Sequence, residues 1–221
     1  MDVPFRLRPP AALSSLDRFA IFRAMPALPV HPLRPILLPI LAMIVVIAVS
    51  NVAVQYPIND WLTWGAFTYP LTFLVTDLTN RAQGPARARL VAYVGFPFGI
   101  GLSILVSHFW GLETWSAVRV ALASGFAFLC GQLLDITVFN WLRRQSWWRA
   151  PLFSSVLASA LDTVIFFSAA FAFTGLPWLS WAYGDFGVKI GMAICLLAPF
   201  RVLMPVLAPT LYQPARPTGG G

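Results

Sequence analysis

Six long apolar segments, separated by short polar connections, dominate the sequence. An α-helix needs about 20 residues to cross the hydrocarbon core of a bilayer, and each segment is close to that length. The chain is 58% hydrophobic and 10% charged, with a mean hydropathy of +0.75, which excludes a soluble globular protein and a disordered one. The sequence therefore predicts an all-α polytopic membrane protein with six transmembrane helices, at residues 36–54, 62–79, 89–109, 118–142, 151–173 and 185–207.

Arginine is concentrated in two of the predicted connections. Because cytoplasmic loops collect Arg and Lys, both termini and these two connections are expected to face the cytoplasm of a bacterial inner membrane. The nine tryptophans support this arrangement, since they fall at predicted span ends, as in an aromatic belt. The net charge of +7 then reflects contact with the lipid bilayer, and no nucleic acid partner is expected. The arginines concerned are Arg81, Arg87, Arg89, Arg143, Arg144 and Arg149.

The predicted six-helix transport domain covers residues 36–209. Before it, residues 1–35 form a Pro- and Arg-rich cytoplasmic leader, in which residues 14–25 are compatible with either a short interfacial helix or disorder. After it, residues 210–221 are expected to form a flexible tail. The sequence has no CxxC, no His/Cys cluster, no phosphate-binding loop and no nucleophile–base pair. We therefore expect no cofactor, no metal and no enzymatic activity.

Three acidic residues, Asp77, Asp135 and Asp162, lie inside the predicted spans. An ionised side chain costs about 2.5–3.5 kcal/mol there. Such acids must pair, carry protons or face a polar interior, so each is a candidate functional residue. Hydrogen bonding between helices is the alternative role for Asp135 and Asp162, and Asp77 could instead pair with Arg81 or Arg87. At helical spacing, the acids share faces with these polar and aromatic residues: Asn80 with Asp77, Gln132 and Phe139 with Asp135, and Ser159 and Phe166 with Asp162.

A single lysine, Lys189, enters the sixth segment. It follows Asp185 by four residues, which favours an ion pair along the helix, but partnership with one of the deep acids is also open. Near the end of the first segment, Asn51 and Gln55 either line a cavity or meet the outer interface. Gly95, in a GxxxG pattern in the third segment, indicates close helix packing or a kink.

Four sequence motifs together carry a resemblance to a known family. They are FTYPLTFLVTDLTN (67–80), GQLLDITVFNWLRR (131–144), WWRAPLFSSVLASALDTVIFFS (147–168) and GDFGVKIGMA (184–193). In this order, over about residues 50–209, they resemble the queuosine precursor transporter family, also called the vitamin uptake transporter family. That family often has an acidic residue after TDLTN, where this chain has Arg81.

The resemblance implies an importer of 7-cyano-7-deazaguanine and/or 7-aminomethyl-7-deazaguanine, the precursors of queuosine. It also implies six transmembrane helices, similar to the substrate-binding subunits of energy-coupling-factor transporters. Two modes of action are open: a stand-alone secondary transporter, or a vitamin- or nucleobase-binding subunit that needs a separate ATPase module. A homodimer is also compatible with the sequence.

The donor pair of a deazaguanine, N1–H and the exocyclic amine, matches one carboxylate. We therefore expect Asp135 or Asp162 to bind the guanine edge, and Phe139 or Phe166 to stack on the ring. Gln132 would hydrogen-bond the ring, while Asp77 and Asn80 would gate the site from the inner side. Lys189, with Asp77, would balance charge during transport. Ser159 and Asn140 complete the expected substrate-binding set.

Overall fold

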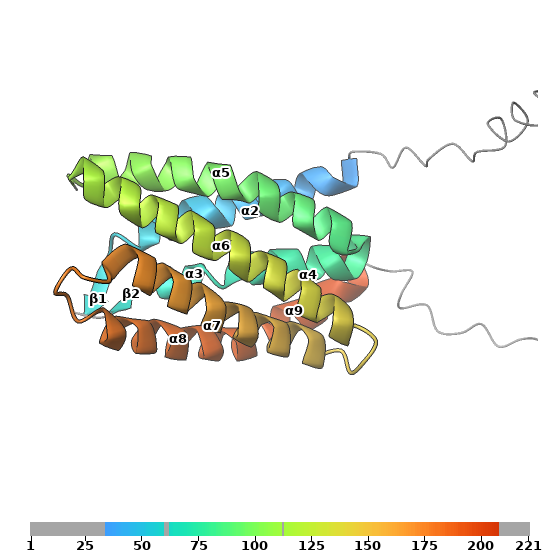
Figure 1. Cartoon of the computed structure of the whole chain (residues 1–221). Coiled ribbons are helices and arrows are strands. Elements are labelled where there is room, and N and C mark those ends of the chain that lie inside the picture. Colours follow the sequence, from blue (N-terminus) through green and yellow to red (C-terminus); the bar gives the residue numbers. More distant parts are fainter. Residues whose placement is uncertain (1–33, 60–61, 112, 208–221) are drawn as a thin grey trace, which may run out of the picture. The chain divides into compact units, whose positions relative to one another are not determined.

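The computed structural model describes residues 34–59, 62–111 and 113–207 (Figure 1). Residues 1–33 of the predicted leader, including its candidate interfacial helix, and the predicted tail at 210–221 lie outside these residues. The described chain is mainly helical, as the sequence predicts, with one short β-hairpin in addition. In chain order the elements are α2 (Arg34–Ala53), β1 (Pro57–Asn59), β2 (Leu62–Thr63), α3 (Gly65–Thr68), α4 (Leu71–Gln83), α5 (Pro85–Phe109), α6 (Thr114–Leu142), α7 (Arg149–Phe171), α8 (Trp178–Cys195) and α9 (Leu197–Leu207).

Four of the described helices are long and apolar enough to cross a membrane, namely α2, α5, α6 and α7. They correspond to the first, third, fourth and fifth predicted segments. On α2, large apolar side chains such as Leu38 and Val45 are 64% and 59% exposed. Such a face is unfavourable in water but suits contact with lipid tails. The chain is therefore a multi-pass membrane protein.

The second predicted segment is not one continuous helix. It begins in the β1–β2 hairpin, where Pro57 pairs with Thr63 and Asn59 pairs with Leu62 in an antiparallel register. The one-turn helix α3 follows, and the chain then breaks before α4, which has only 13 residues. Pro70 lies at the break and explains it, because proline has no backbone N–H with which to continue the helical hydrogen bonds. At about 1.5 Å per residue, α4 is about 20 Å long, which is shorter than a bilayer core.

The sixth predicted segment begins earlier than expected and is bent. It starts at Trp178 rather than Asp185, and α8 and α9 meet at Leu196 with an angle of 44°. Pro199 explains the break, because in a continuous helix its ring would clash with the carbonyl group of Cys195, four residues earlier. If the bent pair forms one span, the described chain has up to five candidate spans. The sixth span and the likeness to energy-coupling-factor subunits stay predictions.

The packing places α6 along both α5 and α7, with α2 against α5 and α8 against α7 (Figure 1). The short helix α4 contacts α5, α6 and α9. Gly95 on α5 makes a close approach possible, because a Cβ there would lie 3.0–3.2 Å from Ile47, Met43 and Phe128. The packing interpretation of this glycine is thus confirmed. The arrangement leaves a space between the hairpin and the neighbouring ends of α2, α7 and α8.

Candidate functional site

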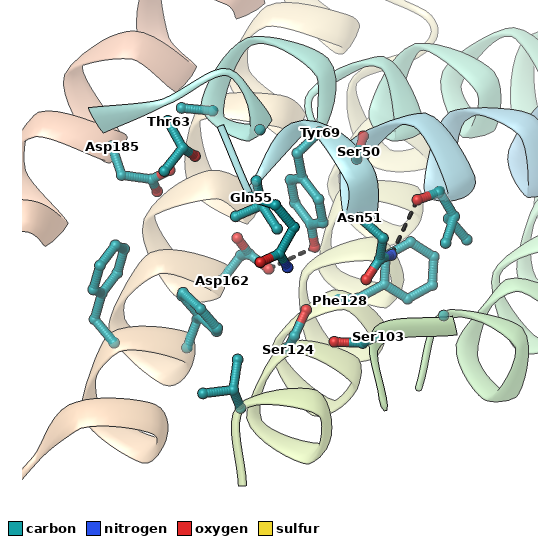
Figure 2. A pocket seen from close by; sticks show the side chains of 18 of the residues that line it. Ser50, Asn51, Gln55, Thr63, Tyr69, Ser103, Ser124, Phe128, Asp162 and Asp185 are labelled. Atoms are coloured by element: carbon teal, nitrogen blue, oxygen red, sulfur yellow. Dashed lines mark hydrogen bonds between the residues drawn. The ribbon is translucent and has the colours of Figure 1, made fainter. Parts of the chain in front are cut away.

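A cavity of about 450 Å³ lies beside the β1–β2 hairpin. Its walls come from α2, the hairpin, α3, α5, α6, α7 and α8. This volume is within the range of about 300–1,000 Å³ that is typical of small-molecule sites. Figure 2 shows polar side chains from several of these elements directed into the same space. The cavity is the candidate ligand site.

Asp162 on α7 is the central charged residue of this cavity. Its Oδ1 accepts a hydrogen bond from the Tyr69 hydroxyl at 2.8 Å, and its Oδ2 accepts one from Lys189 Nζ at 2.7 Å. Lys189 also lies 5.1 Å from the centroid of the Tyr69 ring, within cation–π range. The Asp162 and Lys189 side chains are 4% and 5% exposed. A buried carboxylate is thus held by two partners from other elements.

Lys189 joins Asp162 to a second acid. Its Nζ lies 2.6 Å from Oδ2 of Asp185, four residues earlier on α8. The same Asp185 oxygen accepts a hydrogen bond from Thr163 at 3.0 Å. Both roles that the sequence left open for Lys189 therefore occur together. With all three groups ionised, two carboxylates face one ammonium, so the network has a formal charge of −1 and favours ligands that donate hydrogen bonds or carry a positive charge.

Gly131 allows α7 to bring Asp162 this close to α6. A Cβ at Gly131 would lie 3.3 Å from Cβ of Asp162 and 3.5 Å from the carbonyl oxygen of Ala158. The first of these contacts is tight and the second is an ordinary van der Waals contact, so a residue larger than glycine would push the two helices apart. The glycine of the GQLLD motif therefore has a packing role directly behind the carboxylate.

Uncharged polar residues complete one wall of the cavity. Asn51 and Gln55 both line it, which answers the question that the sequence left open for them. Ser50 also lines the cavity, and its buried hydroxyl has no hydrogen-bond partner among the residues that the structure describes. A buried hydroxyl without a partner is costly unless water or a ligand pairs with it. This wall can therefore take up further polar groups of a ligand.

Aromatic side chains make up another part of the cavity lining. Phe166 lies 5.0 Å from Phe167 and 5.8 Å from Phe171, measured between ring centroids. Phe171 in turn meets Trp181 of α8 edge-to-face at 5.5 Å. All four residues line the cavity, as does Phe128 on α6. The site combines a charged group with flat apolar surface, as a planar heterocycle requires.

Of the residues expected to bind the substrate or balance its charge, Asp162, Phe166 and Lys189 line the cavity. The other members of that set do not. Asn140 is exposed and accepts a hydrogen bond from Arg143, and Phe139 packs against Phe200 in an apolar cluster. Asp77, Asn80, Gln132, Asp135 and Ser159 are buried between helices.

The buried polar set has its own hydrogen bonds. Gln132 donates to the Thr72 hydroxyl at 3.0 Å and accepts from the Thr76 hydroxyl at 2.7 Å. Asn80 donates to the carbonyl oxygen of Ile136 at 3.1 Å. These bonds join α4 to α6, so Gln132 and Asn80 contribute to helix packing in this structure. Asp77 does not pair with Arg81, whose guanidinium donates to the carbonyl oxygen of Arg143 at 2.6 Å.

Tyr69 and Ser50 are site residues that the sequence reasoning did not select for binding. Tyr69 precedes Asp77 by eight residues, about two turns of the helix that the sequence predicts there. In the structure it lies at the break between α3 and α4, and its hydroxyl points toward Asp162 on α7. Nothing in the spacing reveals that break except Pro70. Within the described ranges, no three His, Cys, Asp or Glu side chains gather as metal ligands would.

Comparison with known proteins identifies the family. Residues 63–204 match the family described as "Putative vitamin uptake transporter". The chain is 34% identical to the "Queuosine precursor transporter" of Escherichia coli (strain K12), over 73% of this chain and 83% of that protein. It is 37% identical to the "Probable queuosine precursor transporter" of Haemophilus influenzae, over 70% of this chain and 79% of that protein. No solved structure matches the chain.

The matched residues include the one-turn helix α3, the short helix α4 and all the helices from α5 to α8. They therefore contain the acids of the spans, Lys189 and most of the cavity. The expectation that the protein is not an enzyme agrees with this family, whose named relatives are transporters. The chain belongs to the vitamin uptake transporter family and is a multi-pass membrane transporter.

Proposed function

We propose that the protein imports queuosine precursors, 7-cyano-7-deazaguanine and/or 7-aminomethyl-7-deazaguanine, across the bacterial inner membrane. The observation that carries the proposal is Asp162, a buried carboxylate in an aromatic-lined cavity large enough for a bicyclic heterocycle. The names of the E. coli and H. influenzae relatives supply the substrate class.

Asp162 is the acid that we assign to the guanine edge. Each carboxylate oxygen has two lone pairs, so Asp162 can accept from Tyr69 and Lys189 and still receive N1–H and the exocyclic amine of the ligand. Phe166 and its aromatic neighbours supply a surface on which the ring can stack. The formal charge of −1 on the network suits the aminomethyl cation, for which Asp185 is the second carboxylate.

The cavity is expected to open toward the outer face of the membrane. The arginine-bearing connections, α4–α5 and α6–α7, lie at the opposite end of the helices from the β1–β2 hairpin (Figure 1). Because arginine-rich connections stay on the cytoplasmic side, the hairpin and the cavity beside it would face the periplasm. A substrate would then reach Asp162 from outside, as import requires, with both termini in the cytoplasm.

Binding to the purified protein tests the site. Calorimetry with 7-cyano-7-deazaguanine, guanine and riboflavin should give selective binding of the deazaguanine. Asp162→Asn should abolish this binding or weaken it by about 1.5–3 kcal/mol, the usual contribution of a hydrogen bond to a charged group. Glu113→Gln is the matched control, since it makes the same acid-to-amide change at an exposed residue before α6. Wild-type affinity in a folded Asp162→Asn protein would place the ligand elsewhere.

Uptake into liposomes that contain only this protein separates the two modes of action. Accumulation of the deazaguanine without any other protein supports a stand-alone secondary transporter. Selective binding without uptake would instead support a binding subunit that needs an ATPase module. Binding of riboflavin in preference to the deazaguanine would keep the transporter and remove the substrate assignment.

A further inference from the structure

Two buried carboxyl groups lie against each other outside the candidate cavity. Asp77 on α4 and Asp135 on α6 are 2% and 0% exposed, and they are close enough to interact directly. Neither lines the cavity, and the ion-pair network of Lys189 does not include them. The proposed binding site therefore leaves this second polar centre without a role.

The pair lacks the partners that buried carboxylates need. Both oxygens of Asp135 and Oδ1 of Asp77 have no hydrogen-bond partner within the described ranges. One turn beyond Asp77, Oδ1 of the fully buried Asn80 is unpartnered as well. The hydroxyls that interact with the pair belong to Thr76 on α4 and to Ser154 and Ser155 on α7, and each is a single donor that cannot neutralise charge.

No cation compensates the two acids in the part of the chain that the structure describes. The basic residues on and beside the surrounding helices are either exposed, as Arg89 and Arg144 are, or engaged elsewhere. The engaged ones are Arg81 and Arg143 with each other's carbonyl oxygens, Arg87 with Gln83, Arg119 with the carbonyl oxygens of Ala169 and Ala172, Arg149 with Trp148, Arg201 with Trp147, and Lys189 with Asp162 and Asp185. Two adjacent carboxylates without a counter-ion repel each other in a low-dielectric interior. One shared proton removes the repulsion and lets one acid donate a hydrogen bond to the other.

We propose that the Asp77–Asp135 pair binds and releases a proton in each transport cycle, so that import is coupled to the proton gradient. The pair joins α4 to α6, and α4 is the short helix next to the chain break at Pro70, so movement of α4 would separate the two acids. On release, the proton would pass to water and leave two carboxylates, which would take up another proton in the next cycle. The coupling to import rests on the proposed function, whereas the proton site itself does not.

A series of hydrogen bonds runs from the cavity toward this pair. Tyr69, whose hydroxyl bonds Asp162, also accepts the Thr72 hydroxyl on its carbonyl oxygen at 2.8 Å. Gln132 then bridges the hydroxyls of Thr72 and Thr76, at 3.0 and 2.7 Å. Gln132 precedes Asp135 by three residues, so the series ends one helical turn from the pair. A ligand that moves Tyr69 would thus change the contacts of both helices that carry the acids.

The proton site is tested on the purified protein by infrared spectroscopy during a pH titration. A protonated carboxyl group has a carbonyl-stretching band that a carboxylate lacks. We expect the wild type to show such a band, and Asp77→Asn and Asp135→Asn to remove or shift it, with Glu113→Gln unchanged. A band that neither substitution alters, or no titrating band at all, would overturn the proposal whatever the substrate is.

Transport then tests the coupling. In liposomes, an imposed pH gradient should drive accumulation of 7-cyano-7-deazaguanine by the wild type, and both Asn variants should lose it while keeping calorimetric binding. Wild-type accumulation in the variants, or accumulation that needs a sodium gradient instead, would overturn proton coupling at this pair. Loss of binding in both variants would also overturn it, because the pair would then belong to the binding site. If the wild type binds no deazaguanine, the proposed function fails and the infrared titration still decides the proton site.

Discussion

Lys189 on α8 and Asp162 on α7 form a buried ion pair with Nζ and Oδ2 2.7 Å apart. The pair fixes the relative position of two helices that both line the cavity, and it keeps a carboxylate inside an apolar membrane domain. A second contact of Nζ, to Asp185 at 2.6 Å, adds an acid that the charge on Lys189 alone does not balance. Charge, helix packing and the candidate site thus depend on the same three residues.

Removal of the Lys189 charge alone should destabilise the protein more than removal of the Lys189 and Asp162 charges together. Lys189→Met leaves the buried Asp162 and the partly buried Asp185 without a counter-ion, and we expect the free energy of unfolding to fall by about 3–5 kcal/mol. The double variant Lys189→Met with Asp162→Asn should recover part of that loss, because one uncompensated charge is gone. Thermal unfolding in detergent measures both. Equal stability of Lys189→Met and the wild type would show that the ion pair does not hold α7 and α8 together.

The Tyr69 hydroxyl should contribute to stability through Asp162 alone. Tyr69→Phe keeps the ring over Lys189 but removes the 2.8 Å hydrogen bond, so the free energy of unfolding should fall by about 1–2 kcal/mol. The control is Tyr93→Phe on α5, a tyrosine that is 51% exposed, for which a change within about 0.5 kcal/mol is expected. Chemical denaturation of both variants provides the comparison, and indistinguishable values would remove this role for Tyr69.

The sequence predicted the long helices and the residues that share their buried faces. Continuous apolar runs leave few alternatives to a membrane helix, and the face of α6 that carries Gln132 and Asp135 is indeed fully buried. The break in the second segment was missed because apolar residues occur on both sides of Pro70, with no charged residue between Leu62 and Thr76 to separate them. A hairpin of five strand residues, Pro57–Asn59 and Leu62–Thr63, is too short to leave a periodic signal.

The identity of the acid at the cavity was also beyond the sequence. Helical spacing shows that Asp135 and Asp162 each lie on a polar face, but it does not say whether that face meets a cavity or another helix. That outcome depends on which helices pack closely, which Gly131 and Gly95 decide through contacts far apart in sequence. Asp162 thus lines the cavity, while Asp135 meets Asp77.

Gly131 should be intolerant of even one added methyl group. Gly131→Ala places a Cβ 3.3 Å from Cβ of Asp162, so α7 must shift by a few tenths of an ångström and the affinity for the deazaguanine should fall. Gly101→Ala is the matched control, because a Cβ there meets nothing within 4 Å, and alanine should stabilise that helix by up to about 1 kcal/mol. Calorimetry and thermal unfolding of the two variants should diverge. Equal gains in stability with unchanged binding would show that the α6–α7 contact accommodates the added methyl group without strain.

Two phenylalanines that the sequence could not tell apart should respond in opposite ways to the same substitution. Phe166 lines the cavity, so Phe166→Leu should weaken ligand binding by about 1–3 kcal/mol, the range for stacking of a base on an aromatic ring, with little loss of stability. Phe139 is fully buried and lies 6.1 Å from Phe200 between ring centroids, so Phe139→Leu should lower the free energy of unfolding by about 1–2 kcal/mol and leave the affinity unchanged. Calorimetry and denaturation of both variants measure the two effects. The reverse pattern would move the binding site from Asp162 to the α4–α6 contact around Asp135.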